Sequence, residues 1–234
     1  KTDDRPVLAI LPGSRTLELK RNLPILASAA AQLAEARPDV RFVVACLHDR
    51  HKALAEEVVG ETLAASGRPE PKLEILAGRT PELIRLADVA WSVSGSVSLE
   101  LMMEALPTVI VYKIRPFDLW VARWFIKSKY ITLVNLLADA ELMPEYLTSV
   151  DVSADLARWA RTWLDDPLAR ARATADLAAL RHTAARPGAA GRAADQILCW
   201  LHDHRGAAPP PSSAVDRGPH ERAVELESIE DPGA

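Results

Sequence analysis

The stretch of this 234-residue chain that decides the fold is Val7-Leu8-Ala9-Ile10-Leu11-Pro12-Gly13-Ser14-Arg15. Five consecutive apolar residues ended by Pro-Gly predict a short strand buried on both faces, as strands of parallel sheets are. The Ala- and Leu-rich segment from Leu17 to Ala36 follows and ends before Arg37-Pro38, which indicates a helix. A buried strand, a glycine turn and a helix form the opening of a βαβ unit.

Strand-like and helix-like segments continue to alternate outward from this stretch. This alternation predicts an α/β fold with a parallel sheet that helices cover on both faces. Ligands of such sheets bind beyond the carboxyl ends of the strands, so we expect chemistry in the loops after Leu11, Leu47, Val93 and Lys113. The further strands are predicted at 41–47, 72–76, 88–93 and 108–113, and the helices at 49–59, from Thr80, and at 97–105, 116–129, 153–165, 168–182 and 189–204.

Three parts are predicted along the chain. Residues 1–150 form the ligand-binding domain, residues 151–205 are helices packed on it, and residues 206–234 form a tail. The tail carries prolines and scattered acids without an apolar period, so it is expected to be disordered. The chain begins Lys-Thr-Asp-Asp-Arg-Pro, without an initiator Met or a signal-type apolar region, so we expect a piece of a longer polypeptide.

Composition excludes several classes of protein. Hydrophobic residues make up 49% and charged residues 26%, which is ordinary for a soluble globular chain. The net charge of −4 provides no general positive field, so no nucleic-acid partner is predicted. Two cysteines, Cys46 and Cys199, cannot form a disulfide framework, and they indicate buried cytosolic thiols. The histidines lack the spacing of a zinc site, so no metal is predicted.

The loop Pro12-Gly13-Ser14-Arg15 has the composition of an anion site. Gly13 lets the backbone approach a bulky anion, and the helix that follows supplies free N–H groups and a favourable dipole. Arg15 adds a guanidinium fork suited to phosphate oxygens. The loop lacks the further glycines of a dinucleotide fingerprint and the Gly-Lys-Ser/Thr of a P-loop, and a simple turn with an exposed Arg is the alternative interpretation.

A second loop after the fourth predicted strand resembles the first in composition. Ser94, Gly95 and Ser96 again direct a glycine and hydroxyls toward a helix start. Glu100 is not a capping-box partner, because position 97 is Val, so its carboxylate is available for ribose hydroxyls. Two such loops and a carboxylate together predict a nucleotide-diphosphate site.

The segment 113–129 is the most unusual in the chain. Its aromatic and apolar residues occupy both sides of a predicted helix, so each of the two apolar faces must be buried against another surface. The sheet provides one, and the other is either an ordinary contact, within the chain or with a second subunit of a homodimer, or a membrane surface. Five basic residues stand against one acid, a net of 5 − 1 = +4, which favours an anionic membrane surface. These charges are Lys113, Arg115, Arg123, Lys127, Lys129 and Asp118.

Together these motifs resemble, in their order, the C-terminal half of the lipid-A-disaccharide synthase family. The resemblance rests on 10–15, on 94–100, on Val111-Tyr112-Lys113 with Arg115-Pro116-Phe117, and on Tyr130 through Asn135-Leu136-Leu137 to Pro144-Glu145. It implies the type B glycosyltransferase fold, of which this chain would be the C-terminal domain: a Rossmann-like, doubly wound parallel sheet.

The resemblance also implies an activity. The family transfers diacylglucosamine from UDP-2,3-diacylglucosamine to 2,3-diacylglucosamine 1-phosphate, making the β-1,6 lipid A disaccharide on the inner, cytoplasmic face of the bacterial membrane. It uses no metal or other cofactor, so side chains and helix N-termini must stabilise the charge on the leaving UDP. The domain that binds the acceptor is not in this chain, which would supply the donor-nucleotide half.

Carried over by position, the family's functional residues fall in the loops already described. Arg15 and Asn135 would be catalytic, and Glu100 would hold the ribose. The remaining residues of the UDP-sugar site would be Gly13, Ser14, Ser94, Gly95, Ser96, Lys113, Arg115 and Pro116. The chain departs from the family at Ala105-Leu106, Val134 and Asp139-Ala140. The alternatives are another type B glycosyltransferase that uses a UDP sugar, a non-catalytic nucleotide-sugar-binding module, and a scaffolding domain.

Overall fold

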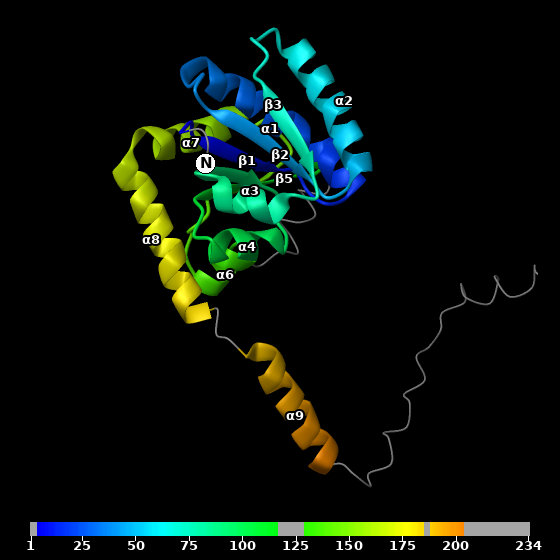
Figure 1. Ribbon diagram of the computed structural model, residues 1–234, viewed down its shortest axis with the longest axis vertical. Coiled ribbons are helices and arrows are strands. Elements are labelled where there is room, and N and C mark those ends of the chain that lie inside the picture. Colours follow the sequence, from blue (N-terminus) through cyan, green and yellow to red (C-terminus); the bar gives the residue numbers. More distant parts are fainter. Residues whose placement is uncertain (1–3, 117–128, 185–187, 204–234) are drawn as a thin grey trace, which may run out of the picture. The chain divides into compact units, whose positions relative to one another are not determined.

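The computed structural model describes residues 4–116, 129–184 and 188–203, and these fall into two units, one up to Arg186 and one from Pro187. In the first unit they form a six-stranded, parallel sheet (Figure 1). Its strand order is β3-β2-β1-β4-β5-β6. The strands are β1 (Val7–Leu11), β2 (Arg41–Cys46), β3 (Leu73–Ala77), β4 (Val89–Ser92), β5 (Thr108–Lys113) and β6 (Glu145–Thr148).

Helices cover both faces of this sheet, as the sequence predicts. Neighbouring residues of β1 show why: Leu8 and Ile10 belong to one core cluster, and Ala9 and Leu11 belong to the other. The first cluster contains residues of α1 (Thr16–Ala36), α2 (Asp49–Ser66) and α7 (Ser153–Asp165). The second contains residues of α3 (Thr80–Leu86), α4 (Val97–Met103), α6 (Leu133–Ala138) and α8 (Pro167–Ala184). Continuous apolar runs are therefore required in the strands.

The order of the strands creates a switch point between β1 and β4. The chain moves outward from β1 to β3 and then returns to the other side of β1, so the loops after β1 and β4 diverge from adjacent strands. Leu11 lies beside Ser92 in the ladder, and the Val93 N–H donates to the Leu11 carbonyl oxygen at 3.1 Å. Ligands of open α/β sheets bind at such a crevice.

Several predicted elements have different bounds in the structure. Helix α2 continues through Gly60 to Ser66, because its residues Val59 and Leu63 are buried in the core. It is followed by Gly67, which has φ +64°. Thr80 is the first residue of α3 rather than its cap. Helix α6 and strand β6 were not predicted, because α6 has six residues and β6 is a partly exposed edge strand without a continuous apolar run.

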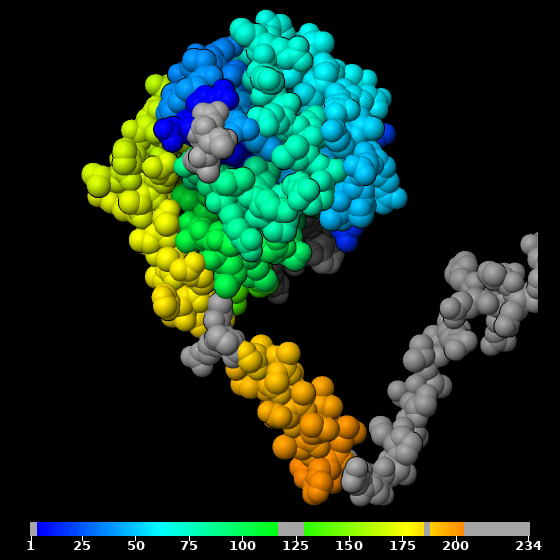
Figure 2. All heavy atoms as spheres, viewed as in Figure 1, coloured from blue at the N-terminus to red at the C-terminus, as the bar shows by residue number. Residues whose placement is uncertain are grey.

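The helices after residue 150 belong to both units. Helices α7 and α8 pack on the sheet domain, and Figure 2 shows α8 against the segment that contains α4 and α6. Helix α9 (Ala189–Asp203) belongs to the second unit, so its predicted packing stays a prediction. Cys46 is buried as expected, but the expectation for Cys199 is wrong, because α9 carries it exposed. Residues 117–128 of the aromatic segment and the predicted tail at 206–234 lie outside the described residues.

Candidate functional site

A cavity of about 600 Å³ lies at the switch point, between the two loops that the sequence singles out. Their adjacent strands bring the loops together although about 80 residues separate them in the chain. From the predicted site, the cavity is lined by Gly13, Ser14, Arg15, Ser94, Gly95, Ser96 and Glu100.

The first loop is held in place by a residue that sequence reasoning missed. Glu18, in the first turn of α1, accepts hydrogen bonds at Oε2 from the backbone N–H groups of Ser14 (3.2 Å) and Arg15 (3.3 Å). Its Oε1 pairs with Nη1 of Arg15 at 3.0 Å. Gly13 has φ +111°, and a Cβ at this position would lie 2.7 Å from the Glu18 carboxylate. The signal in the sequence was an acid three residues into the helix from Arg15, the residue that caps it.

The second loop leaves its backbone open to the cavity. A Cβ at Gly95 would meet no atom within 4 Å, and Gly95 and Ser96 are exposed. Ser94 is anchored from behind, because its hydroxyl donates to the Ile131 carbonyl oxygen at 3.2 Å. Glu100 lies one turn into α4 and is exposed, so its carboxylate is accessible from the cavity.

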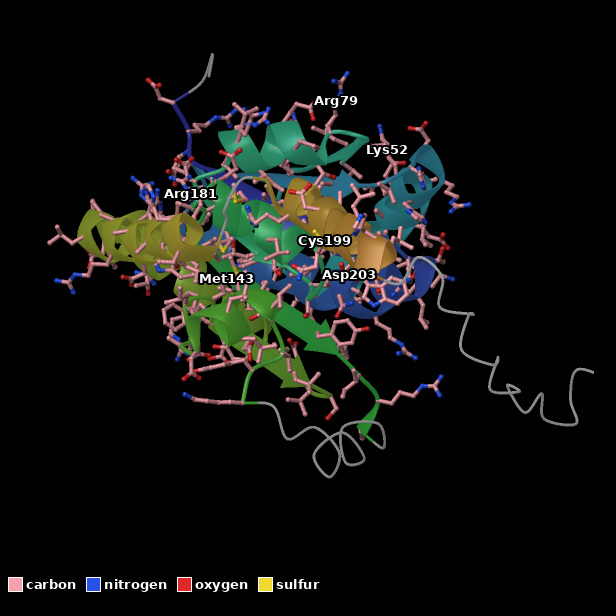
Figure 3. The ribbon with its side chains drawn as sticks, turned by 90° about the horizontal axis from the view of Figure 1, so that it is seen from below. Lys52, Arg79, Met143, Arg181, Cys199 and Asp203 are labelled. Atoms are coloured by element: carbon pink, nitrogen blue, oxygen red, sulfur yellow. The ribbon has the colours of Figure 1, made fainter. Side chains whose placement is uncertain are left out.

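A further wall of the cavity comes from the ends of β2 and β3. It is largely apolar and includes Ala45, Leu47, Gly78, Thr80 and Pro81. Two basic side chains labelled in Figure 3 lie near the starts of the helices that follow these strands. Lys52 is in the first turn of α2, and Arg79 directly precedes α3. The loop after β2 was expected to contribute to the site. The loop after β3 could have been found by the same rule, since it too follows the carboxyl end of a parallel strand.

Four residues of the predicted site do not line this cavity: Lys113, Arg115, Pro116 and Asn135. The backbone N–H of Lys113 donates to the buried Asn22 side chain at 2.8 Å, which ties the end of β5 to α1. Arg115 and Pro116 follow it and are exposed. Their predicted contact with a donor sugar stays a prediction.

Asn135 is fully buried, and its amide is engaged by the protein itself. Its Oδ1 accepts from the N–H groups of Leu142 and Met143, both at 2.9 Å, and its Nδ2 donates to the Met143 carbonyl oxygen at 2.7 Å. Nδ2 also donates to Oε2 of Glu145 at 3.1 Å. The structure thus gives Asn135 a supporting role in the fold, and its predicted catalytic role stays a prediction.

Glu145 connects this network to the second loop. Its carboxylate accepts from the backbone N–H groups of Ile131 (2.7 Å) and Thr132 (2.9 Å) and from the Thr132 hydroxyl (2.7 Å). The carbonyl oxygen of the same Ile131 receives the Ser94 hydroxyl. The Asn135 network therefore holds the segment on which Ser94 rests.

Burial is the main influence on the pKa of two side chains, Cys46 at the end of β2 and His51 in the first turn of α2. Burial raises the pKa of the Cys46 thiol to about 11, so it is protonated at neutral pH and is a poor nucleophile, as predicted. Burial lowers the pKa of His51, whose Nδ1 has no hydrogen-bond partner among the described residues. Over the described ranges, no group of three His, Cys, Asp or Glu side chains could hold a metal ion.

A family model described as lipid-A-disaccharide synthetase matches residues 2–168. The lipid-A-disaccharide synthase of Pseudomonas putida (strain W619) is 32% identical over 201 residues, which cover 86% of this chain and 51% of that protein. The lipid-A-disaccharide synthase of Anaeromyxobacter dehalogenans (strain 2CP-1) is 36% identical over 194 residues, covering 83% and 49%. The chain thus spans about half the length of the curated relatives it matches.

Solved structures share the fold at low sequence identity. The C-terminal domain of a glycosyl transferase group 1 family protein (LpcC) from Francisella tularensis has a TM-score of 0.54 at 14% identity, covering 79% of this chain and 88% of that one. An S. aureus MnaA-UDP co-structure has a TM-score of 0.57 at 12% identity, covering 85% and 47%. These likenesses confirm the α/β fold expected from the sequence.

Proposed function

This chain belongs to the lipid-A-disaccharide synthase family, and on that basis we propose that it is the donor-nucleotide half of a hexosyltransferase. The reaction transfers diacylglucosamine from UDP-2,3-diacylglucosamine to 2,3-diacylglucosamine 1-phosphate. The bond between carbon 1 of the donor sugar and the β-phosphate oxygen breaks, and its electron pair stays on UDP. The acceptor hydroxyl forms the new bond to carbon 1 and gives its proton to a general base. The second domain of the family's fold would bind that acceptor and supply the base.

The observation that carries the proposal is the cavity at the switch point, with its two glycine- and serine-containing loops. Negative charge grows on the diphosphate as the bond breaks, so fixed donors aimed at that charge accelerate the step. Arg15 supplies a guanidinium whose side chain is 81% exposed and therefore within reach of a ligand. On the opposite side of the cavity, the diphosphate can approach the backbone of Gly95 and Ser96, directly before α4, because no atom lies within 4 Å of a Cβ built at Gly95.

The other parts of the nucleotide fit the remaining walls. Glu100 is placed to accept hydrogen bonds from ribose hydroxyls, because its exposed carboxylate lines the cavity beside the second loop. Leu47, Pro81 and Ala45 form an apolar surface against which a flat base can pack. The proposal needs no metal, since the charge on UDP is met by Arg15 and backbone N–H groups.

Calorimetric titration of UDP in EDTA tests the proposal through Arg15→Ala. Removing a charge-assisted phosphate contact costs about 1.5–3 kcal/mol, which corresponds to a loss of affinity of roughly 10- to 150-fold. Arg158→Ala is the matched control: Arg158 is also exposed and pairs with an acid three residues away, Asp155, but it does not line the cavity. Unchanged affinity in Arg15→Ala, or binding only with Mg²⁺, would contradict the proposal.

We also propose that the protein acts at the inner face of the cytoplasmic membrane through segment 113–129. The support is the charge of this segment and the amphiphilic nature of the proposed substrates, whose acyl chains lie in that membrane. In the parts of the chain that the structure describes, no helix is long and apolar enough to span a membrane. Co-sedimentation with anionic vesicles should fall as salt rises and in Arg123→Glu/Lys127→Glu. No binding to anionic vesicles, with an altered oligomer size in Trp124→Ala, would favour the homodimer contact instead.

A further inference from the structure

The donors that a diphosphate would use at the first loop are already engaged by a carboxylate of the same chain. Oε2 of Glu18 accepts from two consecutive backbone N–H groups, those of Ser14 and Arg15, and Oε1 pairs with the Arg15 guanidinium. A carboxylate, like a phosphate, presents two oxygens to such donors. Glu18 therefore occupies the position that the proposed function assigns to an anionic oxygen of the ligand.

The fit of Glu18 in this position is close. Its side chain is only 16% exposed, although Arg15 beside it is 81% exposed. Its carboxylate lies against Gly13, where a Cβ would come within 2.7 Å of Oε2. Because Glu18 also lines the cavity, it lies between the loop backbone and any ligand that enters there.

Resting on the proposed function, we propose that Glu18 is an internal competitor of the diphosphate. Each backbone N–H has a single proton, so a diphosphate that accepts from the N–H groups of Ser14 and Arg15 displaces the carboxylate that they now donate to. When the nucleotide product leaves, Glu18 returns to the loop, and the N–H groups of Ser14 and Arg15 are never left without an acceptor. Glu18 thereby weakens nucleotide binding and promotes product release.

The competing interpretations are a permanent helix cap and a charge that acts only through space. Two variants separate them. Glu18→Gln keeps the length of the side chain and removes its charge, whereas Glu18→Asp keeps the charge and is one methylene too short to hold the loop as Glu18 does. Competition for donors predicts tighter binding in both variants, and repulsion through space predicts it only in Glu18→Gln.

The test is calorimetric titration of the full chain with UDP and with inorganic pyrophosphate, both in EDTA. We expect Glu18→Gln and Glu18→Asp to bind each probe about three- to tenfold more tightly than wild type, because the competing acceptor is neutral and therefore weaker in Glu18→Gln and too short in Glu18→Asp. Asp155→Asn is the control, since Asp155 also lies in a first turn and pairs with an Arg three residues away, outside the cavity. Its affinity should equal that of wild type.

Thermal unfolding provides a second readout. Without ligand both Glu18 variants should melt below wild type, and with saturating UDP the difference should disappear, because the diphosphate replaces the carboxylate at the loop. Unchanged or weaker binding in the variants, or a difference in melting temperature that persists with UDP, overturns the proposal in favour of a permanent cap. Tighter binding in Glu18→Gln alone overturns it in favour of repulsion. Wild-type protein that binds neither probe refutes the proposed function itself.

Discussion

Gly13→Ala is predicted to destabilise the fold, whereas Gly95→Ala is not, although both glycines line the same cavity. Gly13 has φ +111°, which L residues rarely adopt, and a Cβ there would lie 2.7 Å from both Cβ and Oε2 of Glu18. Gly95 has neither constraint, since a Cβ at this position would have no atom within 4 Å. The two substitutions therefore separate a structural requirement for glycine from a requirement imposed by a ligand.

The magnitude follows from two contributions. A non-glycine residue held in this backbone region costs about 1–3 kcal/mol. Moving Glu18 aside breaks its hydrogen bonds to the loop, at about 0.5–1.5 kcal/mol each. With two such hydrogen bonds the total is about 2–6 kcal/mol, which lowers the Tm of a domain of this size by roughly 4–24 °C. Gly95→Ala should change stability by no more than about 1 kcal/mol.

Circular dichroism melting and UDP titration on the same samples check both parts. Gly13→Ala should melt early, and Gly95→Ala should melt like wild type but bind UDP more weakly if the diphosphate packs on that backbone. Each single variant loses the hydrogen bonds between Glu18 and the loop, and Gly13→Ala/Glu18→Ala loses them only once and also removes the contact with Oε2, although the contact with the Cβ of residue 18 remains. The double variant should therefore be about 1 kcal/mol more stable than the two single effects added together. A Gly13→Ala protein that melts within about 2 °C of wild type would refute this reasoning.

Three further predictions concern Glu100, His51 and Asn135. Glu100→Gln should weaken binding of UDP, but 2′,3′-dideoxy-UDP should bind wild type and variant equally in calorimetry; equal losses for both ligands would indicate misfolding instead. Burial holds the pKa of His51 below its usual range, so the unfolded chain takes up a proton as the pH falls below about 6.5, whereas the folded chain takes it up only at lower pH. His51→Leu should therefore lose less stability than wild type between about pH 7 and pH 5 in urea unfolding, and equal losses would exclude His51 as the cause. Asn135→Ala leaves the buried Met143 N–H without its acceptor and removes one of the two acceptors of the Leu142 N–H, so it should cost about 1–3 kcal/mol in unfolding experiments; unchanged stability with loss of UDP binding would favour direct donor contact by Asn135.

The sequence alone determined the class of fold and the location of the two loops at the cavity. Strands buried on both faces need continuous apolar runs, and those of β1, β2 and β5 are visible without any knowledge of their neighbours. The rule that ligands bind beyond the carboxyl ends of parallel strands then selected the loops containing Gly13 and Gly95. The resemblance to the synthase family was carried by the same motifs and was confirmed by the family match.

Only the tertiary structure decided which of the candidate residues meet. The sequence does not show that β4 lies beside β1, because strand order depends on pairing between distant segments. That pairing brings Glu100 to the cavity, whereas Asn135 is buried outside its lining and bonded to Met143 and Glu145. The role of Glu18 was hidden for a related reason: its partners are backbone N–H groups, which every residue except proline possesses, so only the path of the loop through Gly13 reveals which of them its carboxylate can reach.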